Sequence, residues 1–178
     1  MRKKPGGVQV RTIVLVGFMA AGKSTAGRIV AQRLGWSFVD LDAEIEKHTG
    51  TTIAALFRDH GEAAFREIEL ELTPALVARH DSVLATGGGW AAQDGTIGAL
   101  PDTALSVWLD VSPGESVRRA MADGIRRPLL EVEDPVGEAK SLLAGRYAFY
   151  ERADVRIGVD GRSPRDIADD IVKLVVDV

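Results

Sequence analysis

One eight-residue segment of this chain has the residue types and the spacing that bind nucleotide phosphates. Residues 17–24 read Gly-Phe-Met-Ala-Ala-Gly-Lys-Ser and satisfy the pattern Gly-x-x-x-x-Gly-Lys-Ser/Thr, between an apolar run and a helix-forming stretch. In this pattern backbone N–H groups surround the phosphates, the lysine adds positive charge and the serine hydroxyl binds magnesium. A glycine-rich turn without a ligand would explain neither Lys23 nor Ser24. The segment therefore predicts a site for a nucleoside triphosphate.

Phosphoryl transfer needs magnesium, so a carboxylate is expected near Ser24. Two apolar runs end in an aspartate, at Asp40 and at Asp110. Asp110 leads directly into a Ser-Pro helix start and is better explained as a turn residue. Asp40 is followed by Leu-Asp, and this pair either only caps the next helix or serves the reaction. In the second case Asp40 holds the metal through water, and Asp42 binds a substrate hydroxyl and takes its proton.

The elements that must position these residues alternate between strand and helix patterns. Apolar, β-branched runs predict strands at residues 12–17, 36–40, 82–86, 104–109 and 155–157. Helices are expected at residues 23–34, 43–48 and 53–79, the last bent near 60–61, and after the Ser-Pro starts at 112 and 163. The predicted fold class is α/β, a three-layer αβα sandwich on a five-stranded parallel sheet of the P-loop NTPase type. Such folds bind ligands at the carboxyl edge of the sheet.

The length of 178 residues fits one domain. We expect residues 1–10 to form a disordered N-terminal tail and residues 11–178 a single domain. Residues 121–138 show no clean period and contain the adjacent Arg126 and Arg127. This stretch is either a solvated connection or a mobile lid that excludes water from the phosphates, and we favour the lid.

Composition excludes several other classes of protein. The chain has no cysteine, which excludes disulfides and thiol catalysis. Its net charge of −4 argues against general affinity for nucleic acid. The apolar segment after the basic N-terminus is too short for a signal sequence or a membrane span. We therefore expect a soluble cytoplasmic protein with neither a nucleic-acid nor a membrane partner.

Several segments, in their order along the chain, resemble the shikimate kinases of the nucleoside monophosphate kinase-like group. Besides the phosphate loop they are Phe-Val-Asp-Leu-Asp at 38–42, Gly-Glu-Ala-Ala-Phe-Arg-Glu at 61–67, Ala-Thr-Gly-Gly-Gly at 85–89, Arg-Pro-Leu-Leu at 127–130 and Asp-Gly-Arg-Ser-Pro at 160–164. The resemblance extends from Val14 to about Val176. It implies a monomer that transfers the γ-phosphoryl of ATP to the 3-hydroxyl of shikimate, on the route to chorismate and the aromatic amino acids, with one Mg²⁺.

The resemblance also implies a role for each residue of the site. Lys23, Asp42 and Arg127 are the implied catalytic residues, and Ser24 and Asp40 the implied metal ligands. The implied nucleotide-binding residues are Ala20, Ala21, Gly22, Lys23, Ser24, Thr25, Arg119, Arg127 and Arg162. The implied shikimate-binding residues are Asp42, Arg66, Gly88, Gly89 and Arg146, of which the two arginines bind the carboxylate.

The chain departs from the family pattern at a few positions. Ala20 stands where the phosphate loop usually has another glycine, so a methyl group must be fitted into the curve of that loop. Trp90 follows the three glycines where a small residue is usual, and it is expected to reshape the pocket wall. The proline common near Arg146 is missing, and Arg126 adds a second arginine beside Arg127.

Two other functions remain as alternatives. A related small-molecule kinase, such as one for gluconate, would also use Arg66 and Arg146 for an anionic substrate. A nucleotide-binding regulator would bind ATP without turnover. The Asp-Leu-Asp and triple-glycine motifs favour shikimate, and the complete set of charged residues favours catalysis.

Overall fold

The computed structural model describes residues 8–123 and 132–176, and these form alternating strands and helices. The strands are β1 (Thr12–Val16), β2 (Ser37–Asp40), β3 (Ser82–Ala85), β4 (Ala104–Asp110) and β5 (Val155–Gly158). The helices are α1 (Lys23–Leu34), α2 (Leu41–Thr49), α3 (Ile53–Val77), α4 (Pro113–Ala122), α5 (Pro135–Tyr150) and α6 (Pro164–Val176), with a short 3₁₀ helix, η1, at Trp90–Ala92.

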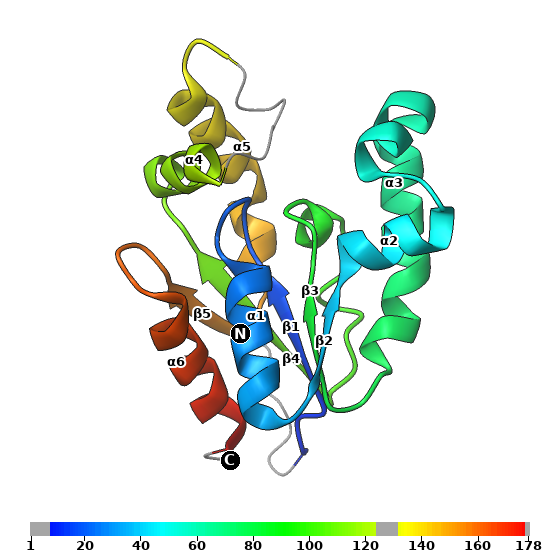
Figure 1. The fold of residues 1–178 in the computed structure, drawn as a ribbon, viewed down its shortest axis with the longest axis vertical. Coiled ribbons are helices and arrows are strands. Elements are labelled where there is room, and N and C mark those ends of the chain that lie inside the picture. The colour runs from blue at the N-terminus through cyan, green and yellow to red at the C-terminus, as the bar shows by residue number, and fades with distance from the viewer. Residues whose placement is uncertain (1–7, 124–131, 177–178) are drawn as a thin grey trace.

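The five strands form one parallel sheet in the order β2-β3-β1-β4-β5. All residues of the central strand β1 are buried, as expected for a strand covered on both faces. Helix α1 lies on one face, where Gly27 leaves room for Leu15 and Phe38, and α6 packs beside it (Figure 1). The predicted α/β class and five-stranded parallel sheet are confirmed.

Helix α5 covers the opposite face of the sheet. Trp108 follows Val107 on β4, and Val107 is in register with Leu15, so the indole projects to the side away from α1. Two tyrosines of α5 pack on this indole, with ring centroids 5.1 Å away for Tyr147 and 5.7 Å for Tyr150. The three layers are therefore α1 with α6, the sheet, and α5.

Most element boundaries agree with the sequence prediction to within one or two residues. The predicted break in α3 lies at Gly61, where φ is +79° and the helix is interrupted. The predicted cap at Ser112 accepts a hydrogen bond from the Glu115 N–H at 3.3 Å. Capping residues and glycine therefore mark the helix ends as their chemistry predicts.

Helix α5 is the main element that the sequence prediction did not identify. It begins at Pro135, where Asp134 caps it by accepting from the Gly137 N–H at 2.9 Å. Apolar residues occur all round this helix, so its 3.6-residue period is weak. Both ends of the predicted irregular stretch 121–138 are helical, because α4 continues to Ala122 and α5 begins at 135. Residues 124–131, with Arg126 and Arg127, lie outside the described residues.

The predicted N-terminal tail, residues 1–10, falls largely on residues 1–7, which also lie outside the described residues. Val10 is 8% exposed and belongs to the hydrophobic core, so the domain begins before Arg11. Within the part of the chain that the structure describes, no helix is long and apolar enough to cross a membrane.

Candidate nucleotide and substrate site

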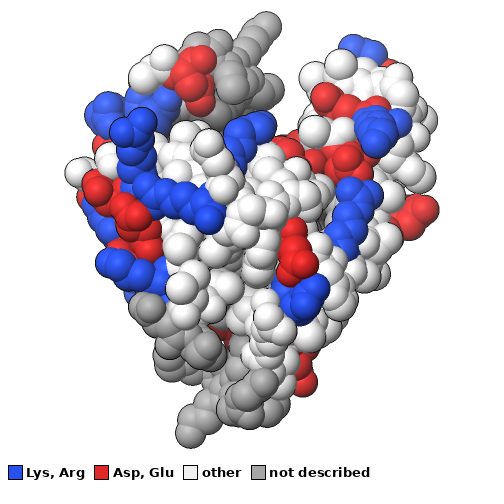
Figure 2. Space-filling model, turned by 60° about the horizontal axis from the view of Figure 1, so that its bottom comes forward, with Lys and Arg blue, Asp and Glu red and all other residues white. Residues whose placement is uncertain are grey.

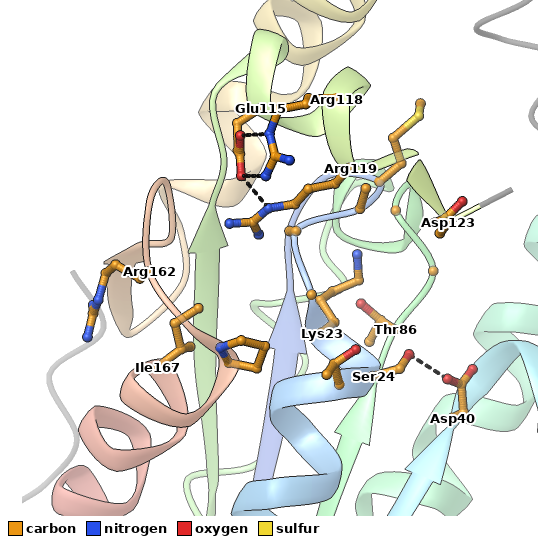
Figure 3. A pocket seen from close by; sticks show the side chains of 18 of the residues that line it. Lys23, Ser24, Asp40, Thr86, Glu115, Arg118, Arg119, Asp123, Arg162 and Ile167 are labelled. Carbon is orange, nitrogen blue, oxygen red and sulfur yellow. Dashed lines mark hydrogen bonds and ion pairs between the residues drawn. The ribbon is translucent and has the colours of Figure 1, made fainter. Parts of the chain in front are cut away.

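A cleft of about 850 Å³ opens at the carboxyl edge of the sheet. Its walls come from the phosphate loop, the ends of β2 and β3, the helix α4 and the loop that precedes α6 (Figure 3). The predicted residues Ala20, Ala21, Gly22, Lys23, Ser24, Thr25, Asp40, Asp42, Gly88, Arg119 and Arg162 all line it. The fold thus brings most of the predicted site residues to one cavity, where parallel α/β sheets bind ligands.

The phosphate loop requires its first glycine, because a Cβ at Gly17 would overlap the carbonyl oxygen of Leu109. Ala20 has φ +53°, in the left-handed region. An L-residue with a Cβ occupies this region at a cost of roughly 1–2 kcal/mol. The buried hydroxyl of Ser116 on α4 donates to the Met19 carbonyl at 2.9 Å and so holds the peptide that precedes Ala20. The missing glycine is therefore accommodated by a strained alanine in an anchored loop.

The polar side chains of this loop are already hydrogen-bonded. Lys23 Nζ donates to the carbonyl oxygens of Gly17 at 2.8 Å and Phe18 at 2.9 Å. Ser24 Oγ donates to Asp40 Oδ2 at 2.7 Å (Figure 3). Asp40 Oδ1 accepts from the Asp42 N–H at 3.2 Å and caps α2. Asp40 therefore caps α2 with one carboxylate oxygen and accepts from Ser24 with the other. A capping role and a role at the phosphate loop are thus compatible.

Asp42 stands at the start of α2 and faces the cleft. Desolvation by the cleft walls is the largest cause that raises the pKa of this carboxyl above its usual value, and the charge of Asp40 adds to it. Lys23 and Arg66 act in the opposite direction without reversing the shift. A carboxylate with a raised pKa in a cleft is a candidate general base.

Arg66 on α3 is held between two glutamates. Its Nη1 donates to Glu69 Oε2 at 2.6 Å, and its Nη2 donates to Glu62 Oε1 at 2.9 Å. Its Nε makes a longer bond of 3.2 Å to the same Glu62 oxygen. These three bonds use three of the five N–H groups that a guanidinium offers. Within the described residues, two N–H groups of Arg66 are thus left for a further acceptor.

The triple-glycine turn lies against both substrate-side arginines. A Cβ at Gly89 would overlap the guanidinium of Arg66. Arg146 on α5 donates from Nη1 to the carbonyl oxygen of Gly88 at 3.2 Å, and the Tyr150 hydroxyl donates to the same oxygen. Burial raises the pKa of Tyr150 to about 12, so its proton stays in place. The two arginines therefore meet adjacent residues of one turn.

The residues predicted to bind shikimate lie beside the phosphate loop, and most of them do not line the cleft. Arg66, Gly89 and Arg146 are not among the residues that line the main cavity, although Gly88 and Asp42 are. A Cβ at Gly88 would lie 3.3 Å from the Met19 backbone nitrogen, so the glycine turn packs directly on the phosphate loop. Trp90 is 1% exposed and does not line the cleft either, so the expectation that it reshapes the wall of this cleft does not hold.

The two predicted nucleotide-side arginines come from different elements that line the cleft. Arg119 on α4 donates to Glu115 Oε1 and to the Val159 carbonyl oxygen, both at 2.7 Å, and lies above the phosphate loop in Figure 3. Arg162 donates to Asp170 of α6 at 2.6 Å. Both guanidinium groups are thus paired with carboxylates.

Glu69 is a site residue that the sequence prediction missed. It is completely buried, and desolvation raises the pKa of its carboxyl although Arg66 opposes the shift. Gln93 Nε2 donates to Glu69 Oε2 at 2.9 Å. The other oxygen, Oε1, has no hydrogen-bond partner among the described residues and lies 2.8 Å from where a Cβ on Gly87 would be. The spacing of three residues from Arg66 on a helix was the signal for this pair.

Comparison with known proteins assigns the chain to a family. The model of the family described as shikimate kinase matches residues 19–176. The chain belongs to the shikimate kinase family. Relatives named shikimate kinase include that of Symbiobacterium thermophilum, 42% identical over 163 residues, which cover 90% of this chain and 94% of the relative. Another, from Synechococcus sp. strain CC9605, is 39% identical over 93% of this chain and 82% of its own length.

Solved structures agree with the family assignment. The shikimate kinase from Acinetobacter baumannii in complex with shikimate matches with a TM-score of 0.86 and 37% identity, over 96% of this chain and 95% of the other. A gluconokinase from Sinorhizobium meliloti matches with a TM-score of 0.57 and 19% identity, which shows a shared fold alone. The chain is therefore an ATP-dependent kinase of the shikimate kinase family, and the alternatives of a gluconate kinase and of a regulator without turnover lose their support.

Proposed function

We propose that the cleft is where this member of the family transfers the γ-phosphoryl of ATP to the 3-hydroxyl of shikimate, giving ADP and shikimate 3-phosphate. The observation that supports this site is the position of Asp42. Asp40 and Lys23 on the phosphate-loop side and Arg66 on the carboxylate-binding side all act on the pKa of its carboxyl. A base between a phosphate site and an arginine is what transfer from a nucleotide to the hydroxyl of an acid requires.

On the nucleotide side, the backbone of residues 20–25 surrounds the phosphates of ATP. Lys23 exchanges its bonds to the Gly17 and Phe18 carbonyls for phosphate oxygens, which are stronger acceptors because they are charged. Arg119 and Arg162 flank the adenine from the two walls that hold them. Lys23 neutralises charge on the transferring phosphoryl group.

The residues at the loop also fit a magnesium ion. The Ser24 hydroxyl and the Asp40 carboxylate lie 2.7 Å apart, and both are oxygen donors of the hard kind that Mg²⁺ prefers. Magnesium sites in kinases commonly use only one or two side chains, with phosphates and water as the other ligands. Ser24 would bind the ion directly and Asp40 through water. The ion, when bound, neutralises phosphate charge.

On the substrate side, Arg66 and Arg146 bind the carboxylate of shikimate, and Gly88 and Gly89 lie against its ring. Asp42 accepts a hydrogen bond from the 3-hydroxyl and takes its proton as the oxygen attacks the γ-phosphorus. The bond from that phosphorus to the β,γ-bridging oxygen breaks, and its electron pair leaves with ADP. Glu69 keeps Arg66 oriented through the 2.6 Å ion pair.

The sequence pattern extends this proposal to Arg127, which lies outside the described residues. In the proposal Arg127 adds positive charge at the transferring phosphoryl group, as part of a lid between α4 and α5 within a single domain. We further propose a monomeric, cytoplasmic enzyme with one Mg²⁺ and with no nucleic-acid or membrane partner. Each of these statements rests on the motif resemblance and on composition.

A coupled assay of ADP release tests the proposed reaction. ATP consumption should require both shikimate and magnesium, and gluconate and nucleoside monophosphates should be inactive. Turnover of gluconate at a comparable rate would overturn the substrate, and ATP binding without any turnover would overturn catalysis. The predicted preference for shikimate rests on Asp42, Arg66 and the glycine turn at residues 87–89 taken together.

A further inference from the structure

A buried hydrogen-bond chain runs behind Arg66, from α3 to the segment that follows the glycine turn. Thr73 lies one turn after Glu69 on α3, and its Oγ1 donates to the Glu69 carbonyl oxygen at 2.6 Å. The same hydroxyl oxygen accepts from Trp90 Nε1 at 2.9 Å. Both side chains are buried, at 8% and 1% exposure. Trp90 is therefore bonded, through one hydroxyl, to the backbone of α3 at Glu69.

A second connection reaches the carboxylate of Glu69 itself. Gln93 Nε2 donates to Glu69 Oε2 at 2.9 Å, and the same oxygen receives the Nη1 bond of Arg66. Gln93 is in turn fixed to Trp90, because its backbone N–H donates to the Trp90 carbonyl oxygen at 3.2 Å. The segment that starts at Trp90 thus holds both the backbone and the carboxylate of Glu69.

The same segment also limits where Arg66 can be. Gly89 immediately precedes Trp90, and the Arg66 guanidinium occupies the space that a Cβ there would need. A movement of Trp90 would displace Gly89, Glu69 and Arg66 together. Misplacement of a binding group by about 1 Å can cost as much as 10²-fold in rate. The position of Trp90 therefore bears on substrate binding although its indole does not line the cleft.

We propose that Thr73, Trp90 and Gln93 are positioning residues that hold the Glu69–Arg66 pair in the orientation that binds the carboxylate of the substrate. This inference rests on the carboxylate-binding role of Arg66 in the proposed function. It gives Trp90, which stands where the family pattern has a small residue, a definite task. The three residues act through Glu69 and touch neither substrate.

Thr73→Val tests the proposal because it keeps the shape of the side chain and removes the hydroxyl. The KM for shikimate should rise about fivefold, while the KM for ATP stays unchanged. Thr73→Ser, which restores the hydroxyl, should return the KM for shikimate to near its original value. Trp90→Phe removes the second of the two bonds together with part of the buried ring, and it should also raise the KM for shikimate.

Thr12→Val is the matched control for a purely structural effect. Thr12 is 1% exposed, and its one hydroxyl proton is shared between the carbonyl oxygens of Val77 at 3.0 Å and Arg79 at 3.1 Å, at the edge of the sheet opposite the cleft. Thr12→Val and Thr73→Val lose the same group from a buried site near α3. Both should lower the melting temperature, and only Thr73→Val should change the KM for shikimate.

Arg66→Ala separates a failure of this inference from a failure of the proposed function. Arg66→Ala should itself raise the KM for shikimate, and adding Thr73→Val to it should have no further effect. If Arg66→Ala leaves that KM unchanged, the substrate role of Arg66 is wrong and the inference fails with it. If Arg66→Ala raises the KM for shikimate and Thr73→Val does not, the positioning role alone is wrong. The same conclusion follows if Thr73→Val raises this KM by the same factor in the Arg66→Ala background as in the parent. Should Thr73→Val not fold, Gln93→Met, which removes the donor to Glu69, undergoes the same comparison.

Discussion

At the scale of single residues, the proposed role of Asp42 as the general base gives the most specific prediction. Asp42→Asn keeps the size of the side chain and removes the charge that takes the hydroxyl proton. General base catalysis contributes about 10²–10⁴ in rate, so kcat should fall by that factor. Binding of ATP should be unchanged, because the phosphate loop is untouched, and the assay of ADP release with a separate binding titration measures both. Near-full turnover of the variant would exclude Asp42 as the base.

The same substitution should make the folded protein more stable at neutral pH. The pKa of Asp42 is raised in the folded state, so its contribution to stability is complete below its ordinary pKa of 3.8 and is lost as the pH rises through the higher folded value. Asparagine carries no charge at any pH and avoids this loss. Urea denaturation should give Asp42→Asn a higher free energy of unfolding than the parent at pH 7, and this difference should shrink toward acid pH. A difference that stays constant with pH would contradict a raised pKa.

Ala20 offers a second test at this scale. Its φ of +53° costs roughly 1–2 kcal/mol, and glycine removes that strain but loses about 0.5–1 kcal/mol through the entropy of the unfolded chain. Ala20→Gly should therefore raise the free energy of unfolding by up to about 1 kcal/mol. Ala21→Gly is the control, since Ala21 is fully buried and is not among the residues with positive φ, and it should destabilise. Urea denaturation of both variants measures whether each substitution raises or lowers the free energy of unfolding.

Residue chemistry predicted the site more completely on the nucleotide side than on the substrate side. The phosphate loop is contiguous in sequence, so Lys23 and Ser24 could be assigned from spacing alone. The partner of Arg66 could not be assigned from the sequence, because a surface glutamate and the fully buried Glu69 look alike in a helical pattern. Only the packing of the helix distinguishes them. Asp40 received two competing explanations, and in the structure it caps α2 with one carboxylate oxygen and accepts from Ser24 with the other, which leaves the proposed metal role open to test.

At the scale of elements, strands and capped helices were predictable and α5 was not. Strand patterns depend on burial of both faces, which a run of β-branched residues signals directly. Helix α5 presents a different problem because it packs Tyr147 and Tyr150 against Trp108 while apolar residues also lie on its other sides. Its position matters for the proposed function, because it carries Arg146 to the Gly88 carbonyl oxygen.

The segment between α4 and α5 carries the next prediction. Arg127→Ala should strongly reduce kcat with a smaller effect on the KM for ATP, because in our proposal this arginine meets charge that develops in the transition state. Arg126→Ala is the matched neighbour and should do less. Hydrogen exchange over residues 121–138, without and with both ATP analogue and shikimate, should show protection gained on binding. Equal protection in both conditions would make the segment a fixed loop.

At the scale of the whole molecule, the parallel sheet brings the two substrate sites together. Strands β1, β2 and β3 end at one edge, where they are followed by the phosphate loop, by the first turn of α2 with Asp42, and by the glycine turn. The contact between Gly88 and the Met19 backbone joins these loops directly. Figure 2 shows basic and acidic side chains interspersed over the face that it presents. In the proposed function, recognition of two anionic substrates depends on local arginines rather than on the net charge of −4.

The last prediction concerns the assembly state. The large apolar side chains that are exposed among the described residues lie on several elements, including Phe57 and Leu70 on α3, Met121 on α4 and Val176 on α6. Stable oligomers need a contiguous, well-packed interface that buries at least about 1,000 Å². Light scattering during size exclusion should therefore give a mass near 19.1 kDa that does not change with protein concentration. A mass twice that value, with activity that falls on dilution, would show instead that the catalytic unit is a dimer.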